Sequence, residues 1–262
     1  MPFDANTTMM NLDELQQARA KALRNLTPIQ RAEEKINFCL VWLYRWGFSS
    51  PSILNQVAGA VQPICPRLHA LGLIKKNRLA AAGIAGRPSY LVTLTPDGLA
   101  AASRVCEDNL QYKPSIRETQ IRHDLFAQII ALTLSRSGQI RSYIPARLLE
   151  GHNSSVPDVL AVAGTAEQPA LLFIEVELFK KLGNNLVTFS TKIYRHLTKN
   201  PRNIALIATD SHAVAAHYRK AFSPNTTRHI ALPHGDKPGP RQKEEAFTIT
   251  PELANRILIK II

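Results

Sequence analysis

The hydrophobic pattern of the chain changes its period near residue 112, and this change restricts the fold more than any other feature. In the first half, apolar residues recur at every third or fourth position, as on one face of a helix. The clearest such face holds Ile36, Cys39, Leu40 and Leu43, and Gly47 ends it. In the second half, short apolar runs of strand length alternate with helical patterns. With 262 residues the chain is long enough for two domains, which a polar stretch around Pro114 separates.

The first half predicts three helices, a β-hairpin and a closing helix. After the first helix, we expect helices at residues 50–57, 60–71 and 99–105 and strands at 73–80 and 89–94. Pro66 lies inside the third helix, so this helix should begin late, near Cys65. The order of elements, with Leu94-Thr95-Pro96-Asp97-Gly98 after the hairpin, strongly resembles the winged helix-turn-helix family.

That resemblance implies DNA contacts from the third helix and from the hairpin, the wing. On and before the third helix, the side chains that could read bases are Gln62, Arg67 and His69. On the hairpin, Arg78 and Arg87 stand where they could reach phosphates or the minor groove. A winged helix can also be a protein-docking module, and this alternative stays open.

The net charge favours a polyanionic partner. The chain has 32 Lys and Arg against 20 Asp and Glu, which leaves +12 at pH 7. Nucleic acid is the commonest partner of so basic a protein, and double-stranded DNA is the partner we expect; a solvated basic surface is the alternative. The remaining composition, 45% hydrophobic and 20% charged, is that of a globular protein and excludes a disordered chain, a coiled coil or a collagen-like polymer.

Cysteines and apolar runs indicate the compartment. The three cysteines are scattered, without a Cys-x-x-Cys pair, so we expect neither a disulfide framework nor a zinc finger. No apolar run approaches the ~20 residues that span a bilayer, and the start lacks the layout of a signal peptide. We therefore expect a cytoplasmic protein with no membrane insertion.

The second half predicts an α/β domain with a mixed central sheet. The expected helices are 119–136, 185–197, 212–222 and a final helix at 251–262, and the expected strands are 140–144, 156–163, 170–178, 204–208 and 228–232, with Thr248 in a further short strand. The predicted organisation is a flexible segment at 1–29, a winged-helix domain at 30–112 and a second domain at 113–262. Residues 234–242 form a basic loop rich in Pro and Gly.

Acidic residues interrupt two neighbouring strands of this domain. If the turn at 164–169 closes a hairpin about its midpoint, Asp158 lies opposite Glu175, and Glu177 shares the face of Glu175. At such short distances the three carboxylates would repel one another and would need a positive counter-charge. Mg²⁺ or Mn²⁺ is the simplest remedy, because both take carboxylate oxygens as ligands. Solvated glutamates on an exposed strand are the alternative.

The order of helix, Pro157-Asp158 strand, Glu175-Val176-Glu177 strand, helix and strand resembles the PD-(D/E)xK nuclease superfamily, the restriction-endonuclease-like fold. The resemblance implies that the acidic residues bind metal and that a lysine steadies the attacking water and the charge on phosphate. Here Glu177 occupies the usual lysine position, so the lysine must come from elsewhere. Lys192, on the next helix, is the first candidate and Lys181 the second.

A more specific resemblance extends from residue 34 almost to the end. The winged-helix pattern, His123-Asp124-Leu125, the acidic strands and Lys192-x-Tyr194 resemble the plasmid replication-relaxation proteins and the MobC-type relaxases. That family implies metal-dependent strand nicking at a plasmid transfer origin, with other mobilisation proteins as partners. It would give His123 a place near the metal or phosphate, and Tyr194 a nucleophilic or phosphate-contacting role; packing roles are the alternative for both.

Two other functions stay open. Glu177 stands where the nuclease pattern has its lysine, and this favours a non-catalytic DNA-binding replication initiator or regulator with a vestigial nuclease fold. A transposition or restriction endonuclease would share the same core but cut both strands. The commoner relaxase chemistry is disfavoured because no His-x-His occurs, and nucleotide hydrolysis because no phosphate-binding Gly-x-x-x-x-Gly-Lys loop occurs.

Overall fold

The computed structural model describes residues 26–79, 88–106, 112, 114, 116–149, 156–231 and 244–262. The chain divides into two compact units. The N-terminal unit runs to Gly138 and includes residues 147–149, and the C-terminal unit comprises 139–146 and the chain from Glu150 onwards. The sequence placed the boundary near residue 112, so the observed division differs by one whole helix. Most of the expected flexible segment, Arg87 and the 234–242 loop lie outside the described residues.

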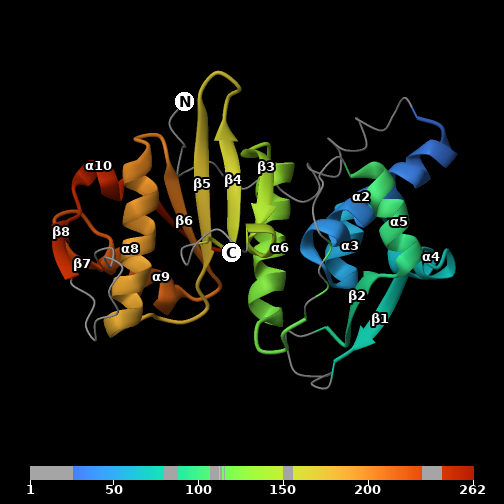
Figure 1. Cartoon of the computed structure of the whole chain (residues 1–262), viewed down its shortest axis with the longest axis horizontal. Helices are drawn as coiled ribbons and strands as arrows, with labels where there is room; N and C mark the ends of the chain where they lie inside the picture. Colours follow the sequence, from blue (N-terminus) through green and yellow to red (C-terminus); the bar gives the residue numbers. More distant parts are fainter. Residues whose placement is uncertain are drawn as a thin grey trace, which may run out of the picture. The chain divides into compact units, whose positions relative to one another are not determined.

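The N-terminal unit consists of helices with a small hairpin at their lower edge in Figure 1. Its elements are α2 (Pro28–Trp46), α3 (Pro51–Ala58), α4 (Ile64–Ala70), β1 (Ile74–Arg78), β2 (Tyr90–Leu94), α5 (Pro96–Val105) and α6 (Ile121–Arg136). β1 and β2 pair antiparallel, and Ser49 bridges to Val92 of β2. The expected order of three helices, a hairpin and a helix is thus observed.

Helix α4 begins at Ile64, which agrees with the late start expected from Pro66. Pro66 occupies the first turn, where a backbone N–H would have no partner inside the helix, so the missing donor costs little there. Pro63 stands at the N-cap and offers no side-chain cap. Asn55 of α3 supplies one instead, because its Oδ1 accepts the Ile64 N–H at 2.9 Å.

The start of α5 explains why glycine stands at residue 98. Thr95 caps the helix by accepting the Gly98 N–H at 3.0 Å, and its own N–H donates to Leu73 O at 3.1 Å. These bonds draw the chain so close to the start of β1 that a Cβ on Gly98 would lie 1.9 Å from Leu73 O. Gly98 therefore permits a backbone contact that no side chain allows.

Helix α6 belongs to the N-terminal unit because a buried glutamine holds it there. Gln128 has no exposed surface. Its Oε1 accepts hydrogen bonds from Trp42 Nε1 at 3.1 Å and Ser49 Oγ at 2.7 Å, and its Nε2 donates to Phe48 O at 3.0 Å. A buried polar network of this kind fixes the position of a helix closely, since each unmade bond would leave a buried polar group unpaired.

The C-terminal unit contains a mixed five-stranded sheet, which confirms the α/β class. The strands are β3 (Ile140–Pro145), β4 (Val159–Gly164), β5 (Pro169–Val176), β6 (Ile204–Thr209) and β9 (Ile257–Ile261), in the order β3-β4-β5-β6-β9. β3, β4 and β5 pair antiparallel, whereas β5, β6 and β9 pair parallel. The helices are α7 (Ala146–Leu149, at the boundary between the units), α8 (Gly183–Lys199), α9 (His212–Ala221) and α10 (Pro251–Ala254), and β7 (Thr227–Ala231) pairs with β8 (Glu244–Thr248).

The expected final helix at 251–262 is wrong. Only α10 is helical, and the chain continues as strand β9, parallel to β6. β9 contains Ile257, Ile259 and Ile261, and β-branched side chains are stiff in helices but fit a pleated strand well. The free edge of β6 supplies the hydrogen-bonding partner that this segment needs.

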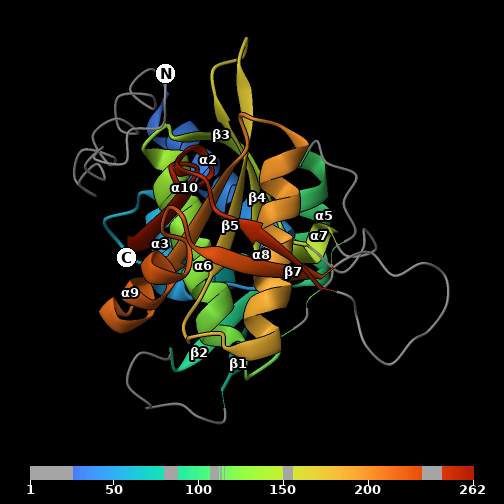
Figure 2. The ribbon, with the colours of Figure 1, turned by 90° about the vertical axis from the view of Figure 1, so that its left-hand side faces the viewer.

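Helices α8 and α9 cover one face of the sheet (Figure 2). The core between them contains Phe173 and Ile207 from the strands, Phe189 and Ile193 from α8, and Tyr218 from α9. Because side chains alternate along a strand, Glu175 points to the same face as Phe173. Within the part of the chain described, no helix combines the length and the apolar character needed to cross a membrane.

Candidate active site

Asp158 lies opposite Glu175 across the β4–β5 hairpin. The register runs from Gly164↔Pro169 to Val159↔Ile174, and the next residues along both strands are Asp158 and Glu175. The register expected from the turn is therefore the one observed. Asp158 Oδ2 also accepts the Val176 N–H at 2.7 Å, which fixes this half-buried carboxylate at the end of β5.

The two glutamates of the Glu-x-Glu segment are both buried, Glu175 with 3% and Glu177 with 4% of its surface exposed. Glu177 comes directly after β5, and its N–H donates to Ala208 O of β6 at 2.8 Å, so the backbone is still held by the sheet. Solvated glutamates on an exposed strand are thus excluded. Moving a carboxylate from water into the core costs on the order of several kcal/mol of folding free energy unless a partner compensates its charge.

Lys192 of α8 compensates Glu175. Its Nζ lies 2.6 Å from Glu175 Oε1, and the lysine side chain is only 19% exposed. The same Nζ stands 5.4 Å from the centre of the Phe173 ring, one step along the α8-covered face of β5. The lysine therefore reaches the carboxylate across an apolar and aromatic surface that water hardly enters.

Lys181 and Tyr218 compensate Glu177. Lys181 Nζ forms an ion pair with Glu177 Oε1, and the Tyr218 hydroxyl donates to Glu177 Oε2 at 3.2 Å. Lys181 also lies 4.5 Å from the centre of the Phe189 ring. Sequence reasoning missed Tyr218, because it comes from α9, far along the chain, and nothing in its local sequence marks it as polar chemistry inside a core.

The acidic residues influence one another electrostatically. Burial raises the pKa of Glu175 to about 8; repulsion from Asp158 adds to this rise, and Lys192 and Lys181 oppose it. Burial also raises the pKa of Glu177, the Lys181 ion pair opposes the rise, and Asp158 adds to it. We call these five residues, Asp158, Glu175, Glu177, Lys181 and Lys192, the acid–lysine cluster. Burial and the charge of Asp158 therefore favour the protonated form of Glu175, whereas Lys192 and Lys181 favour its charged form.

The donor chemistry of the cluster fits Mg²⁺ or Mn²⁺, since carboxylate oxygens are the ligands both prefer. The arrangement is not that of a preformed cage. In the described part of the chain, no group of three or more His, Cys, Asp or Glu side chains is gathered as a metal site. The lysines supply part of the positive charge that the sequence assigned to a cation, so a bound cation would share Glu175 with Lys192.

His123 and Tyr194 make other contacts than those of the cluster. His123 lies on α6 in the N-terminal unit, where its Nδ1 is 3.2 Å from Asp124 Oδ1. Tyr194 lies on α8, but its ring packs on Phe247 of β8 with the ring centres 4.6 Å apart. The ring contact of Tyr194 agrees with the packing role considered as its alternative.

The candidate DNA-contacting residues that the structure describes are all exposed. Arg67 and His69 lie on α4, Gln62 precedes it, and Arg78 lies on β1. Lys75 and Lys76, also exposed on β1, extend the basic surface of the hairpin and were missed from the sequence. Arg87 lies outside the described residues.

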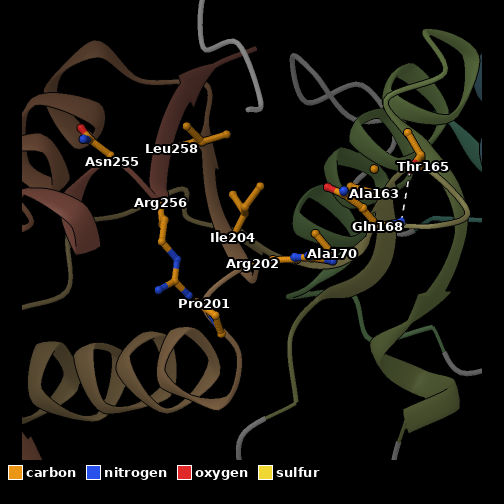
Figure 3. Close-up of a pocket in the computed structure, with 11 residues that line it drawn as sticks. Ala163, Thr165, Gln168, Ala170, Pro201, Arg202, Ile204, Asn255, Arg256 and Leu258 are labelled. Carbon is orange, nitrogen blue, oxygen red and sulfur yellow. Dashed lines mark hydrogen bonds between the residues drawn. The ribbon is translucent and has the colours of Figure 1, made fainter. Parts of the chain in front are cut away.

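A separate pocket of about 710 Å³ opens at the other end of the central strands, where β5 and β6 begin (Figure 3). Ala170, Ile204 and Leu258 contribute to its mainly apolar lining. Arg256 borders it, but its guanidinium donates to the backbone oxygens of Leu197, Asn200 and Asn203 and so closes the turn after α8. None of the acid–lysine cluster lines this pocket.

Comparison of the chain with protein-family models, with curated proteins and with solved structures gave no match.

Proposed function

We propose that this protein is a metal-dependent DNA endonuclease that nicks one strand, a mobilisation relaxase acting at a plasmid transfer origin. The observation that carries the proposal is the surroundings of Glu175: Asp158, which directly precedes β4, accepts the N–H of the next residue, Val176, and Lys192 Nζ lies 2.6 Å from Glu175 Oε1. Two carboxylates and a lysine in one partly buried site are the residue types that metal-assisted phosphodiester cleavage requires.

Each residue has a role that its surroundings support. Asp158 and Glu175 would hold Mg²⁺ or Mn²⁺, which when bound supplies a water of lowered pKa and neutralises charge growing on phosphate. Lys192 would steady that same charge, since an ammonium beside a phosphoryl oxygen stabilises the transition state. Glu177, held by Lys181 and Tyr218, would complete the metal's surroundings or accept a proton from water.

The raised pKa of Glu175 supports a chemical role over a structural one. A carboxyl group with a pKa of about 8 changes its charge near neutral pH. Strongly shifted groups with a specific charged partner gather at functional sites more often than elsewhere. A buried ion pair adds little to the free energy of unfolding compared with apolar side chains of similar size. Stability alone therefore does not explain a carboxylate at this position.

The N-terminal unit would bind the DNA as a winged helix. Its order of elements and the small hairpin support this assignment, and the net charge of +12 supports a polyanionic partner. Helix α4, with Arg67 and His69, would enter the major groove, and the β1–β2 hairpin, with Lys75, Lys76 and Arg78, would lie along phosphates.

One observation favours a second function, a non-catalytic DNA-binding replication initiator or regulator. Lysines pair with both buried glutamates, so two of the three carboxylates already have a counter-charge without a cation. A protein of this kind would bind the same DNA and leave it uncut.

Incubation with supercoiled plasmid separates these functions. The proposal predicts that Mg²⁺ or Mn²⁺ converts a plasmid carrying the transfer origin into open circles and that a chelator stops the reaction. Retention of supercoils at protein concentrations that saturate the DNA would favour the non-catalytic function. Linear product formed without an open-circle intermediate would instead indicate cleavage of both strands, as in a restriction or transposition endonuclease.

A further inference from the structure

The segment between β5 and α8 presents two large apolar side chains to solvent beside the acid–lysine cluster. Phe179 is 76% exposed and Leu182 66% exposed. Phe179 follows Glu177 by two residues, so their Cα atoms lie within about 7 Å of each other. An exposed aromatic ring this close to a candidate active site can touch whatever occupies that site.

The backbone of this segment is fixed, so the exposure is part of the fold. The Tyr218 hydroxyl, which donates to Glu177 Oε2, accepts the Lys181 N–H at 3.3 Å and lies 3.4 Å from Phe179 O. His217 Nε2 lies 3.0 Å from Lys181 O, and the Lys181 ammonium pairs with Glu177. Contacts with α9 and with Glu177 therefore fix the backbone of this segment, while the Phe179 side chain is exposed to solvent.

The charges around Phe179 favour nucleic acid as the occupant. Lys180, its neighbour, is exposed, and Lys181 follows. Because the Lys181 ammonium pairs with Glu177, Lys180 is the lysine left to face a ligand. An exposed ring next to an exposed lysine in the chain matches a nucleotide, in which a flat base is joined to a phosphate. In intact duplex DNA the faces of the bases are covered by their neighbours in the stack, so a ring can stack on a base only where the strand is unpaired or opened.

We propose that Phe179 stacks on an unpaired base next to the phosphodiester bound at the cluster, while Lys180 contacts the adjoining phosphate. The substrate of the C-terminal unit is then single-stranded or locally melted DNA. This inference rests on the proposed function, since it takes the cluster as the place where the DNA strand lies.

The test measures binding without cleavage. Fluorescence anisotropy, in the presence of a chelator, compares the affinity of the full chain for a labelled single-stranded oligonucleotide and for the same sequence as a blunt duplex. We expect Phe179→Ala to weaken single-strand binding about tenfold, as loss of one base–aromatic stack does, and to change duplex binding less than about twofold. Phe179→Trp should restore single-strand binding, and Leu171→Ala, which truncates another exposed apolar residue of the same unit, should change neither affinity.

Three outcomes would overturn the inference: an unchanged single-strand affinity in Phe179→Ala, an equal loss for both DNAs, or no recovery with Phe179→Trp. A change in oligomeric state on gel filtration, with DNA binding unaltered, would assign the ring to contact between copies of the chain and would also overturn it. Because no step requires cleavage, Phe179-dependent binding by a chain that never nicks DNA would remove the proposed function and leave this inference standing.

Discussion

Lys192 Nζ lies 2.6 Å from Glu175 Oε1, and this contact joins helix α8 to the central strand of the sheet in a place almost closed to water. An ion pair in such a place loses most of its hydration, and its attraction roughly offsets that loss. The pair therefore adds little to the free energy of unfolding, and a chemical role explains its place in the core better.

The raised pKa of Glu175 makes the stability of the C-terminal unit depend on pH. Its pKa is about 8 in the folded chain against 4.5 as the ordinary value, so folding takes up a proton between these limits. For this group, the free energy of unfolding is therefore largest below pH 4.5 and falls as the pH rises towards about 8. We expect Glu175→Gln, which never ionises, to be more stable than the wild type, by a margin that grows from pH 5 to pH 8 in urea denaturation.

Glu245→Gln, a change at an exposed glutamate of β8, is the matched control and should leave the pH profile unchanged. A constant difference in stability between Glu175→Gln and the wild type across this pH range would contradict the raised pKa.

Removal of Lys192 should show how far the buried Glu175 carboxylate lowers the free energy of unfolding when it has no partner. At pH 8.5 we expect Lys192→Met to lower the free energy of unfolding by about 2–3 kcal/mol, because Glu175 must then either ionise without a partner or hold its proton. At pH 6 the loss should be smaller, since the protonated carboxyl needs no counter-charge. Lys199→Met, at an exposed lysine of the same helix, should change stability by less than about 0.5 kcal/mol.

The double variant Lys192→Met with Glu175→Gln measures the coupling of the pair. At pH 8.5, Lys192→Met should cost much less stability in the Glu175→Gln background than in the wild type, because no buried carboxylate is then left without a partner. If the two single changes simply add, the two side chains do not interact in solution.

The Gln128 contacts predict a large loss of stability in the N-terminal unit. Gln128→Ala removes the partner of Trp42 Nε1, Ser49 Oγ and Phe48 O inside the core. We expect a cost of about 2–4 kcal/mol in urea denaturation, from the unpaired groups and the cavity. Gln120→Ala, at the exposed start of the same helix, should cost less than about 0.5 kcal/mol. Equal effects would mean that α6 is not held by this network.

Two glycines should respond differently to a methyl group. Gly98→Ala places a Cβ where Leu73 O lies 1.9 Å away, so the start of α5 must move, and we expect a cost of about 3 kcal/mol or more. Gly72→Ala meets open space, but its φ of +69° is unfavourable for alanine, so about 1 kcal/mol is expected. Thermal unfolding of both variants checks the order; similar losses would contradict the close approach at Gly98.

The sequence predicted best what depends on neighbouring residues. The hairpin register that sets Asp158 opposite Glu175 follows from a turn and an alternation of side chains, both local in the chain. The late start of α4 likewise follows from the geometry of Pro66 alone. Lys192 as the first candidate lysine came from a resemblance, and its contact with Glu175 agrees with that choice.

The remaining errors concern what an element packs against. The apolar stripe of α6 predicts a helix but does not say which core it faces, and the Gln128 network that decides this joins residues about eighty positions apart. The end of the chain was assigned to a helix because no turn signal interrupts it after α10, while its pairing partner, β6, lies far away in sequence. Glu177 follows β5, Lys181 precedes α8 and Tyr218 lies on α9, so their contacts form only when these elements pack together. No local sequence pattern predicts that packing.

The rate of nicking in matched variants tests the central claim most directly. Wild type, Asp158→Asn, Lys192→Met and the exposed control Glu167→Gln are incubated with supercoiled plasmid and Mn²⁺, at concentrations adjusted so that each binds the same fraction of DNA. We expect open circles from the wild type and from Glu167→Gln at the same rate, and a loss of about 100-fold or more in Asp158→Asn and Lys192→Met, as when a metal ligand or a group stabilising the transition state is removed. Nicking by Asp158→Asn at the wild-type rate, or none by the wild type itself, would contradict the account.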